Sequence, residues 1–335
     1  MLSSHPLSKF PTLKPHLEKL RMLGYRSLED MIYAAQAARP ELEAFLGTSI
    51  DPLVSTALAG TSAASIPASA RAAMTADMYA LGAAVEGVPA LDTVPRALSR
   101  ESLPSKVSLI GALPPVLDQG SRGTCVAFSI LAAYQHLLQM SGARHDLSEQ
   151  FLYWNCKRHD DLPDLDATFI HIGGSRVRHQ GTCTESLWPY NPAPIPGNLG
   201  QGPPPGGAVQ EASSFRSPAF ERLSPTGVED VKARIAGGRV VVFSVRMFNS
   251  SFVNEWVKLT GQVSMPIPGE VSLGGHAMCA VGYEETAEEA IGGGRFLIRN
   301  SWGGRWGINS PLGTGYGTLP FDYLAKFGIE AGAFV

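Results

Sequence analysis

Residues 118–129 of the chain read DQGSRGTCVAFS, and this stretch decides the fold. It leads into the run CVAFSILAAYQHLLQM over 125–140, which is apolar on almost every face of a helix. We therefore predict a buried central helix that begins at Cys125, with Ser121 or Thr124 capping its first turn. A cysteine at a helix N-terminus feels the positive end of the helix dipole, which favours the nucleophilic thiolate.

The residues just before this helix suit acyl-transfer chemistry at the cysteine. Gly120 and Gly123 lack side chains where a substrate backbone would have to approach the thiol. Gln119 is placed to donate its amide N–H to a developing oxyanion, alongside the backbone N–H of Cys125. The stretch predicts a nucleophile and two oxyanion donors at one end of one helix.

A histidine and an asparagine late in the chain fit a general-base pair. Of eight histidines, only His276 lies beyond residue 179, and its setting GGHAMCAVGY predicts a glycine turn that enters a buried strand. A second strand, GRFLIRN, ends at Asn300. The two strands can pair as a hairpin, so that the Asn300 oxygen accepts from the His276 imidazole and fixes its tautomer. Trp302 can shield that hydrogen bond from water.

These local contexts resemble the active site of the papain-like cysteine peptidases. The order of Cys125, His276 and Asn300 is the one that this family uses. His276 follows the cysteine by 151 residues, near the upper end of the roughly 130–150 expected for papain-type enzymes. The resemblance gives the oxyanion hole to Gln119 and Cys125, and supporting positions to Gly123, Gly275 and Trp302.

The resemblance extends over residues 103–335. It includes the mature N-terminal segment, the LSEQ helix start, an aromatic-Pro-Tyr turn and a glycine-rich hairpin, found here at 103–116, 147–150, 188–190 and 306–317. Three positions depart from the family pattern. Val126 stands where the family usually has Trp, and Arg122 where many secreted members have a disulfide cysteine. Asp166-Ala167-Thr168 occupies the region of the usual substrate-binding glycine pair.

The resemblance implies an α+β, papain-like fold with a helical lobe, a β-rich barrel-like lobe and a small N-terminal helical domain. It implies a hydrolase, a thiol protease that cleaves protein or peptide substrates through a Cys-His-Asn triad and a thioester acyl-enzyme. Two other functions stay open. One is another acyl transfer at the same site, such as deamidation or transglutamination, and the other is a non-catalytic binding protein on a peptidase fold.

The sequence divides into three regions. Residues 1–60 predict four short helices. The first is Lys14–Met22, and the others start at the capping-box-like Ser27-Leu28-Glu29-Asp30, at Pro40 and at Asp51-Pro52. Residues 61–102 predict a linker with a short helix at Met74–Val85, and 103–335 form the peptidase domain. The first 102 residues stand where the family has its inhibitory segment in zymogens. They are expected to dock on the chain's own cleft, to recruit a protein partner, or to aid folding.

Residues 191–217 are rich in Pro and Gly, so we predict neither a helix nor an inner strand there. The segment is either a surface crossover within the domain or a loop that overhangs the cleft.

Composition restricts partners and compartment. The net charge of −3 gives no general attraction to nucleic acid or anionic membranes. The sequence contains no run of about 20 apolar residues, so we expect no membrane span. The N-terminus lacks the apolar region of a secretory signal, so we expect synthesis in the cytoplasm, with signal-independent export as the alternative.

Four cysteines are present, and Cys156 and Cys183 could pair or stay free, while Cys279 fits core packing. No metal-ligand spacing or phosphate-binding loop occurs, so we expect no metal or other cofactor.

Overall fold

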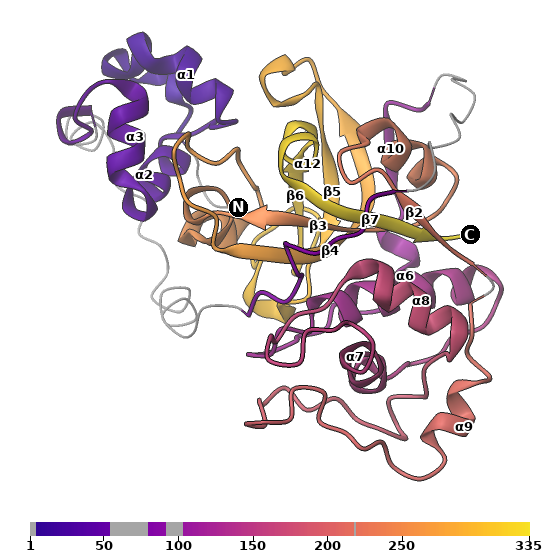
Figure 1. The fold of residues 1–335 in the computed structure, drawn as a ribbon. Coiled ribbons are helices and arrows are strands. Elements are labelled where there is room, and N and C mark those ends of the chain that lie inside the picture. The colour runs from indigo at the N-terminus through magenta and orange to yellow at the C-terminus, as the bar shows by residue number, and fades with distance from the viewer. Residues whose placement is uncertain (1–4, 54–79, 92–102, 218) are drawn as a thin grey trace.

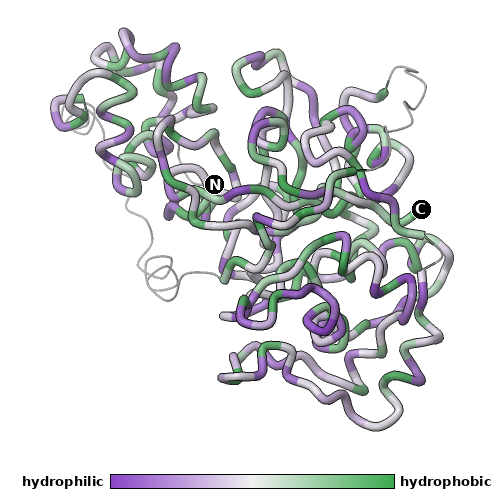
Figure 2. Tube along the Cα trace, viewed as in Figure 1, coloured by the Kyte–Doolittle hydropathy of each residue, from purple (hydrophilic) through white to green (hydrophobic). Residues whose placement is uncertain are grey.

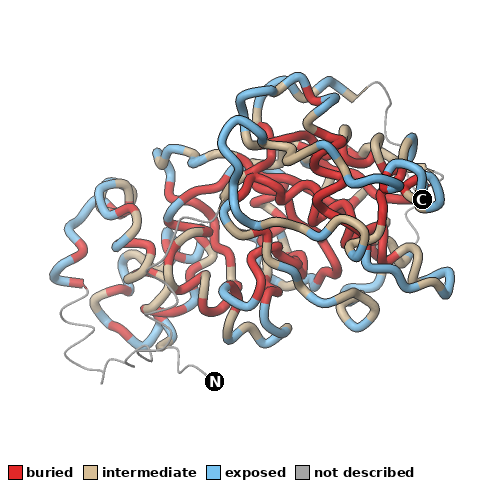
Figure 3. The backbone as a smooth tube through the Cα atoms, turned by 90° about the horizontal axis from the view of Figure 1, so that it is seen from below, coloured by how far each residue is buried: buried red, intermediate tan, exposed pale blue. Residues whose placement is uncertain are grey.

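The computed structural model describes residues 5–53, 80–91, 103–217 and 219–335. Figure 1 shows three parts: short helices near the N-terminus, a lobe built on one β-sheet, and a second lobe made mainly of helices. The predicted α+β, two-lobed fold with N-terminal helices is confirmed. Buried residues lie along the strands of the sheet and where the two lobes meet, and the outer loops are exposed (Figure 3).

The β-rich lobe contains one antiparallel sheet of seven strands among the described residues, in the order β2-β7-β3-β4-β5-β6, with β1 added to β4. The strands are β1 Lys106–Ser108, β2 Phe220–Leu223, β3 Val241–Met247, β4 Gly274–Glu285, β5 Gly294–Arg299, β6 Tyr316–Pro320 and β7 Gly328–Phe334. The predicted hairpin is confirmed as β4 and β5, with Cys279 opposite Arg299. Because the two strands are antiparallel, Asn300, which follows Arg299, lies near the end of β4 that contains His276.

Short helices surround this sheet. They are α10 Val228–Ala236, α11 Glu255–Thr260 and α12 Phe321–Phe327, with single turns η3 Ile110–Ala112, η4 Asn249–Val253, η5 Glu289–Ile291 and η6 Gly303–Arg305. The helix predicted at 228–236 is α10. The strand predicted at 239–245 is β3, which starts two residues later.

The helical lobe is built around α6, with the bounds Cys125–Met140 that the sequence predicts. Its first twelve residues are all buried, because the helix lies between β4 on one side and the helices α7 Glu149–Lys157 and α8 Ile170–His179 on the other. The predicted side-chain cap is wrong. Thr124 is the N-cap residue but makes no capping bond, since its hydroxyl lies 2.7 Å from the hydroxyl of Tyr190 instead.

The Pro/Gly-rich stretch 191–217 is mainly loop, with one short helix, α9 Ala208–Ala212. The prediction of no helix there is therefore wrong over five residues. These residues, AVQEA, begin the part of the stretch without Pro or Gly, 208–217, and Ala208 and Ala212 are buried against Phe151 and Trp154. A local apolar contact thus outweighs the composition of the surrounding loop.

The N-terminal helices are η1 Leu7–Lys9, η2 Pro11–His16, α1 Leu17–Met22, α2 Leu28–Ala37 and α3 Arg39–Leu46. The capping box predicted at Ser27 is present with Asp30 as its partner. Helix α3 ends at its C-cap residue Gly47, which adopts a left-handed φ of 76°. Of the helix predicted after Asp51-Pro52, only residues 51–53 are described, and they are helical. Hydrophobic and hydrophilic residues alternate along these helices, as in amphipathic helices (Figure 2).

The N-terminal helices pack on the β-rich lobe through a continuous apolar core. Tyr25 is buried in that contact, and Tyr33 of α2 stacks on Trp256 of α11 at 6.0 Å between ring centres. The Met265 N–H donates to the Leu23 carbonyl at 2.8 Å. The helices are therefore anchored on the sheet lobe by apolar burial and by backbone pairing.

Residues 80–91 run between the two lobes as an extended segment (Figure 1). The helix predicted at Met74–Val85 is wrong for 80–85, while 74–79 lie outside the described residues. The reason is pairing on both sides. Ala83 forms a parallel bridge with Thr168 of the helical lobe and an antiparallel bridge with Gly275 of β4. A helix would direct these backbone groups inward and lose both partners.

Candidate active site

Cys125 lies at the first position of α6, where this buried helix meets the start of β4. Its side chain is buried, and its Sγ accepts from the Ala277 backbone N–H at 3.4 Å. The residue after His276 thus touches the thiol. Burial raises the pKa of Cys125 to about 11, opposed by backbone N–H groups that include those of Ala277 and Gly82. Burial thus favours the neutral thiol in this covered arrangement.

His276 and Asn300 form the pair that the hairpin predicts. The His276 Nε2 lies 2.8 Å from the Asn300 Oδ1, which also accepts from the Ser301 N–H at 2.8 Å. The His276 Nδ1 is left without a hydrogen-bond partner in the described part of the chain. Burial lowers the pKa of His276 to about 4, although the bond to Asn300 favours the charged form. Burial thus favours the neutral imidazole while the cleft is covered.

Trp302 covers this pair, as the sequence predicts. Its ring stacks on the His276 imidazole at 4.5 Å between centres, and Phe252 meets both rings edge-on. All three side chains are buried. The hydrogen bond between His276 and Asn300 is thus kept away from water, which strengthens it.

Gln119 is held with its amide N–H directed into the cleft. Its Oε1 accepts from the Ser301 hydroxyl at 2.6 Å, so its Nε2 is the atom that faces the other way. The Nε2 donates to the Arg122 carbonyl at 2.8 Å and to the Ala80 carbonyl at 3.0 Å. Ala80 belongs to the extended segment, so a carbonyl oxygen of the chain itself occupies the free donor of Gln119.

The extended segment fills the rest of the cleft. The Ala83 N–H donates to the Gly275 carbonyl at 3.1 Å, the Ala84 N–H donates to the Thr168 carbonyl at 3.0 Å, and the Thr168 N–H donates to the Gly82 carbonyl at 3.0 Å. One strand of chain therefore bridges the two lobes directly in front of the thiol. Asp166-Ala167-Thr168, which departs from the family's glycine pattern, forms the wall on the helical side.

Glycine is required at two positions in this contact. A Cβ on Gly82 would meet the Gly123 carbonyl far inside van der Waals contact, and a Cβ on Gly123 would overlap the carbonyl of Asp166 in the same way. Gly275 is also close, because its Cβ would press on the Ala83 carbonyl. Gly82 and Gly275 thus let the segment approach both walls of the cleft, and Gly123 lets the nucleophile loop lie against Asp166.

All the predicted site residues lie around this one cleft. Sequence reasoning missed the partners that hold them: Ser301, Tyr153, Tyr190, Asp166 and the segment 80–85. Ser301 directly follows Asn300, and its position in the Asn-Ser-Trp-Gly run was the available signal. Tyr190 and Asp166 lie in segments already singled out from the sequence, but nothing local shows that they contact the residues before Cys125. Cys156, Cys183 and Cys279 are buried free thiols, and Cys279 donates to the Ser129 carbonyl at 3.2 Å.

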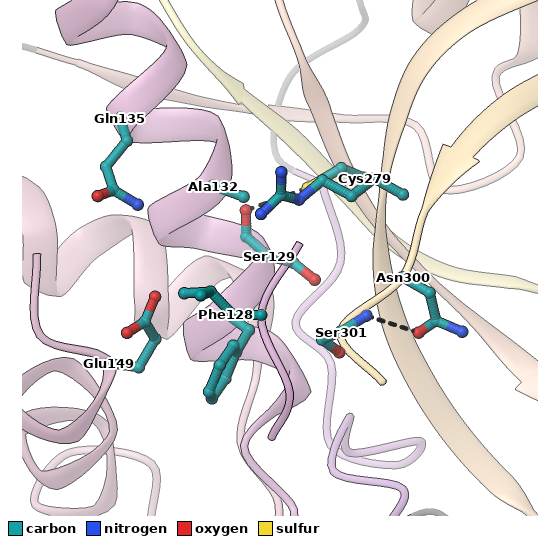
Figure 4. Close-up of a pocket in the computed structure, with 10 residues that line it drawn as sticks. Phe128, Ser129, Ala132, Gln135, Glu149, Cys279, Asn300 and Ser301 are labelled. Atoms are coloured by element: carbon teal, nitrogen blue, oxygen red, sulfur yellow. Dashed lines mark hydrogen bonds between the residues drawn. The ribbon is translucent and has the colours of Figure 1, made fainter. Parts of the chain in front are cut away.

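A small polar cavity lies behind Asn300 and Ser301 (Figure 4). Its volume is about 10 Å³, which is room for about one water molecule. In Figure 4 the side chains of Glu149 and Gln135 point toward one another, and Arg299 also lines the cavity. Glu149 is 2% exposed. Burial raises the pKa of its carboxyl well above the usual value, and the Arg299 charge opposes this.

Replacing Glu149 with Gln is expected to raise stability increasingly as the pH rises. The folded pKa of Glu149 is raised, so above the unfolded pKa of about 4.3 the folded state holds a proton that the unfolded state has lost. Stability from this group is present at low pH and is lost as the pH rises toward the folded pKa, by up to about 1.4 kcal/mol per pH unit. Gln carries no such proton.

Thermal unfolding between pH 5 and 8 checks this prediction, with the exposed Glu289→Gln as the matched control. The Tm difference between Glu149→Gln and the unchanged protein should grow with pH, while the control difference stays flat. Parallel curves for all three proteins would contradict the prediction.

Fold and site together define a class of two-lobed proteins with a thiol beside a histidine–asparagine pair. The chain belongs to the papain family of cysteine proteases, because the model of that family matches residues 106–319.

Two curated relatives are similar in sequence. An uncharacterized peptidase C1-like protein of Acanthamoeba polyphaga mimivirus is 32% identical over 219 residues, which are 62% of this chain and 65% of that protein. A senescence-specific cysteine protease of Arabidopsis thaliana is 28% identical over 224 residues, 65% of this chain and 56% of that protein. The matches therefore span less than two thirds of either relative's length.

Two solved structures are similar in fold. Xylellain, a cysteine protease from Xylella fastidiosa, has a TM-score of 0.62 and 25% identity, and the match covers 76% of this chain and 95% of that chain. The digestive procathepsin L 3 of the Tenebrio molitor larval midgut has a TM-score of 0.57 and 17% identity, and covers 96% of this chain and 98% of that chain. The second likeness concerns the fold alone.

The described residues contain neither a membrane-spanning helix nor a cluster of metal ligands. None of the helices there is long and apolar enough to span a bilayer. Within the same ranges, no group of three or more His, Cys, Asp or Glu side chains is arranged to hold a metal ion.

Proposed function

We propose that this chain is a thiol-dependent endopeptidase in which Cys125, His276 and Asn300 act as the catalytic triad. The observation that carries the proposal is the meeting of three groups in one cleft: the Cys125 thiol, the bonded His276–Asn300 pair and the Gln119 amide. A peptide lying between the two lobes would present its carbonyl to all of them.

The arrangement supports a two-step acyl transfer. His276 takes the proton of Cys125, and the thiolate attacks the peptide carbonyl carbon. The carbonyl oxygen becomes negative and accepts from the Gln119 Nε2 and the Cys125 N–H. The C–N bond breaks as His276 gives its proton to the leaving amine, which leaves a thioester on Cys125. Water, deprotonated by His276, then attacks the thioester, the C–S bond breaks, and the acid is released.

Asn300→Ala is expected to lower kcat less than His276→Ala. His276 moves protons in both steps, so its loss should lower kcat by at least about 10²–10⁴. Asn300 accepts one hydrogen bond from the imidazole and fixes its orientation, and stacking on Trp302 still holds the ring after that bond is lost. The two purified variants are compared on one short peptide. An equal, complete loss in a folded Asn300→Ala protein would show that this residue does more than orient the ring.

Other acyl transfer on the same site is tested by its products. Hydrolysis of a treated protein creates new peptide termini, whereas deamidation or transglutamination changes side-chain masses and leaves the chain uncut. A non-catalytic binding protein would give neither product. It would also fail to react with a thiol-directed active-site probe, which the Cys125–His276 pair should accept.

We also propose that the N-terminal region restrains the enzyme as a zymogen, through the segment 80–85. The Ala80 carbonyl occupies the Gln119 donor that the oxyanion would need. The backbone N–H of Gly82 is a hydrogen-bond donor to the Cys125 sulfur. The thiol therefore faces a donor rather than a carbonyl carbon, and the segment can block the cleft without being cut.

The helices at residues 5–53 fit the role of an anchor. They pack on the β-rich lobe, and Arg26 pairs with Glu288 there at 2.6 Å. A segment tethered to such an anchor competes with substrate at a high effective concentration. Recruitment of a protein partner by these helices is the alternative, and activity on a short peptide separates the two roles.

A further inference from the structure

Arg122 is a charged side chain buried in the loop between Gln119 and Cys125. It is 1% exposed and is among the largest fully buried side chains of the described residues. A buried guanidinium is costly unless its donors are satisfied. Its surroundings show which parts of the molecule satisfy it.

Three neutral oxygens from separate segments accept from Arg122. Its Nη1 donates to the Gln150 Oε1 of α7 at 2.7 Å and to the Asn191 carbonyl at 2.8 Å. Its Nη2 donates to the Leu199 carbonyl at 3.0 Å. One side chain thus connects the nucleophile loop, α7 and both ends of the 191–199 loop. The planar fork of Arg presents its donors to all three acceptors in one fixed geometry.

Two tyrosines flank the guanidinium and lead from it to the active site. Its central carbon lies 5.0 Å from the ring centre of Tyr190 and 5.3 Å from that of Tyr153. The Tyr190 hydroxyl donates to the Gln119 carbonyl at 2.8 Å and lies 2.7 Å from the Thr124 hydroxyl. Tyr190 therefore holds the backbone on both sides of Arg122.

Tyr153 makes the second connection. Its hydroxyl donates to the Asp166 Oδ1 at 2.6 Å, and the Asp166 Oδ2 accepts from the Gly123 N–H at 2.7 Å. Asp166 belongs to the cleft wall on the helical side. The backbone carbonyl of Arg122 itself accepts from the Gln119 Nε2. Gln119, Gly123 and Thr124 are thus connected to Arg122 or to its two tyrosines.

We propose that Arg122 is a positioning residue that, through Tyr190 and Tyr153, sets the oxyanion-binding side of the active site. The inference rests on the proposed peptidase function and assigns a role to a residue in place of the disulfide cysteine found in many secreted relatives. None of these contacts involves the sulfur of Cys125, His276 or Asn300. Loss of Arg122 therefore affects the stabilisation of the oxyanion and leaves the thiol–imidazole pair in place.

Two reactions of the same thiol separate these effects. Peptide hydrolysis passes through an oxyanion and needs the Gln119 and Cys125 donors. Alkylation by iodoacetamide occurs at a saturated carbon, forms no oxyanion, and needs only the thiolate. The ratio of kcat/KM to the alkylation rate constant therefore reports the oxyanion side, because covering of the cleft by the segment 80–85 lowers both quantities in the same proportion.

The test uses the full-length chain with Arg122→Met, Tyr190→Phe, the double variant, and Arg178→Met as an exposed arginine control in the same lobe. We expect Arg122→Met and Tyr190→Phe each to lower kcat per titrated thiol by about tenfold to a hundredfold, since small displacements of catalytic groups have effects of this size. KM and the alkylation rate constant should each stay within about threefold of the unchanged protein, and the pH profile of alkylation should not shift. The double variant should be no slower than Arg122→Met, because both substitutions break the same connection from Arg122 through Tyr190 to Gln119.

An unchanged ratio in folded Arg122→Met and Tyr190→Phe overturns the proposal, and so does an equal fall in hydrolysis and alkylation. Tyr190→Phe keeps the ring beside Arg122 and loses only the hydroxyl, so it carries the test if Arg122→Met does not fold. Failure of the peptidase proposal looks different, because the unchanged protein would then be alkylated but would cut no peptide.

Discussion

Replacing Cys125 with Ala is expected to abolish turnover while the fold persists. The acyl group is bonded to the sulfur of Cys125, and removal of a covalent nucleophile costs about 10⁴–10⁶ in kcat. The fold should tolerate the change because only one sulfur atom is lost, at the start of a helix whose packing involves the eleven buried residues that follow. Rates on a short peptide and thermal unfolding are measured on the same preparations.

Cys279→Ala is the matched control for this experiment. It removes another buried thiol, one that donates to the Ser129 carbonyl and faces the same helix. This variant should keep kcat within a few-fold of the unchanged protein. If pure Cys125→Ala retains more than about a hundredth of the original rate, the nucleophile is another group, since residual activity at that level exceeds what binding and oxyanion donors alone supply.

The parts of the site that the sequence predicts are those set by local pattern. The helix at Cys125–Met140 follows from a long apolar run with a glycine-rich start, and its bounds agree with the prediction. Asn300 comes to His276 because two apolar strands joined by a polar loop pair as a hairpin. Both inferences need only neighbours along the chain and the alternation of burial.

The parts that the sequence does not predict depend on distant partners. The Ala-rich stretch before residue 86 has a high helix propensity, yet 80–85 is extended because Thr168 and Gly275 pair with it from two lobes. Propensity is a weak preference of less than about 1 kcal/mol per residue, and tertiary pairing readily outweighs it. The acceptors of Arg122 lie 28 to 77 positions away along the chain, so only the fold brings them together.

Gly82→Ala is expected to raise activity on a short peptide. Its new methyl group would overlap the Gly123 carbonyl, and Gly123 is itself held against Asp166. The cleft cannot widen without moving the nucleophile loop, so the segment should leave instead. Such overlap costs about 1–3 kcal/mol, which corresponds to roughly a tenfold to hundredfold weaker hold on the cleft. Water then reaches the site, and the burial that raises the pKa of Cys125 and lowers that of His276 is relieved.

Glu86→Ala is the control, because it changes an exposed residue four positions further along the same segment. Three measurements are made on each protein: kcat/KM on a short peptide, the same on a protein substrate, and the rate of thiol alkylation at pH 7. Both kcat/KM values and the alkylation rate should rise in Gly82→Ala and in a chain truncated to begin near residue 103. The separate N-terminal region should inhibit the truncated enzyme when it is added back. A recruitment module gives another pattern, with short-peptide activity unchanged and activity on the protein substrate lost. Unchanged peptide activity in a folded Gly82→Ala protein and in the truncated enzyme would therefore eliminate the inhibitory role and leave recruitment in its place.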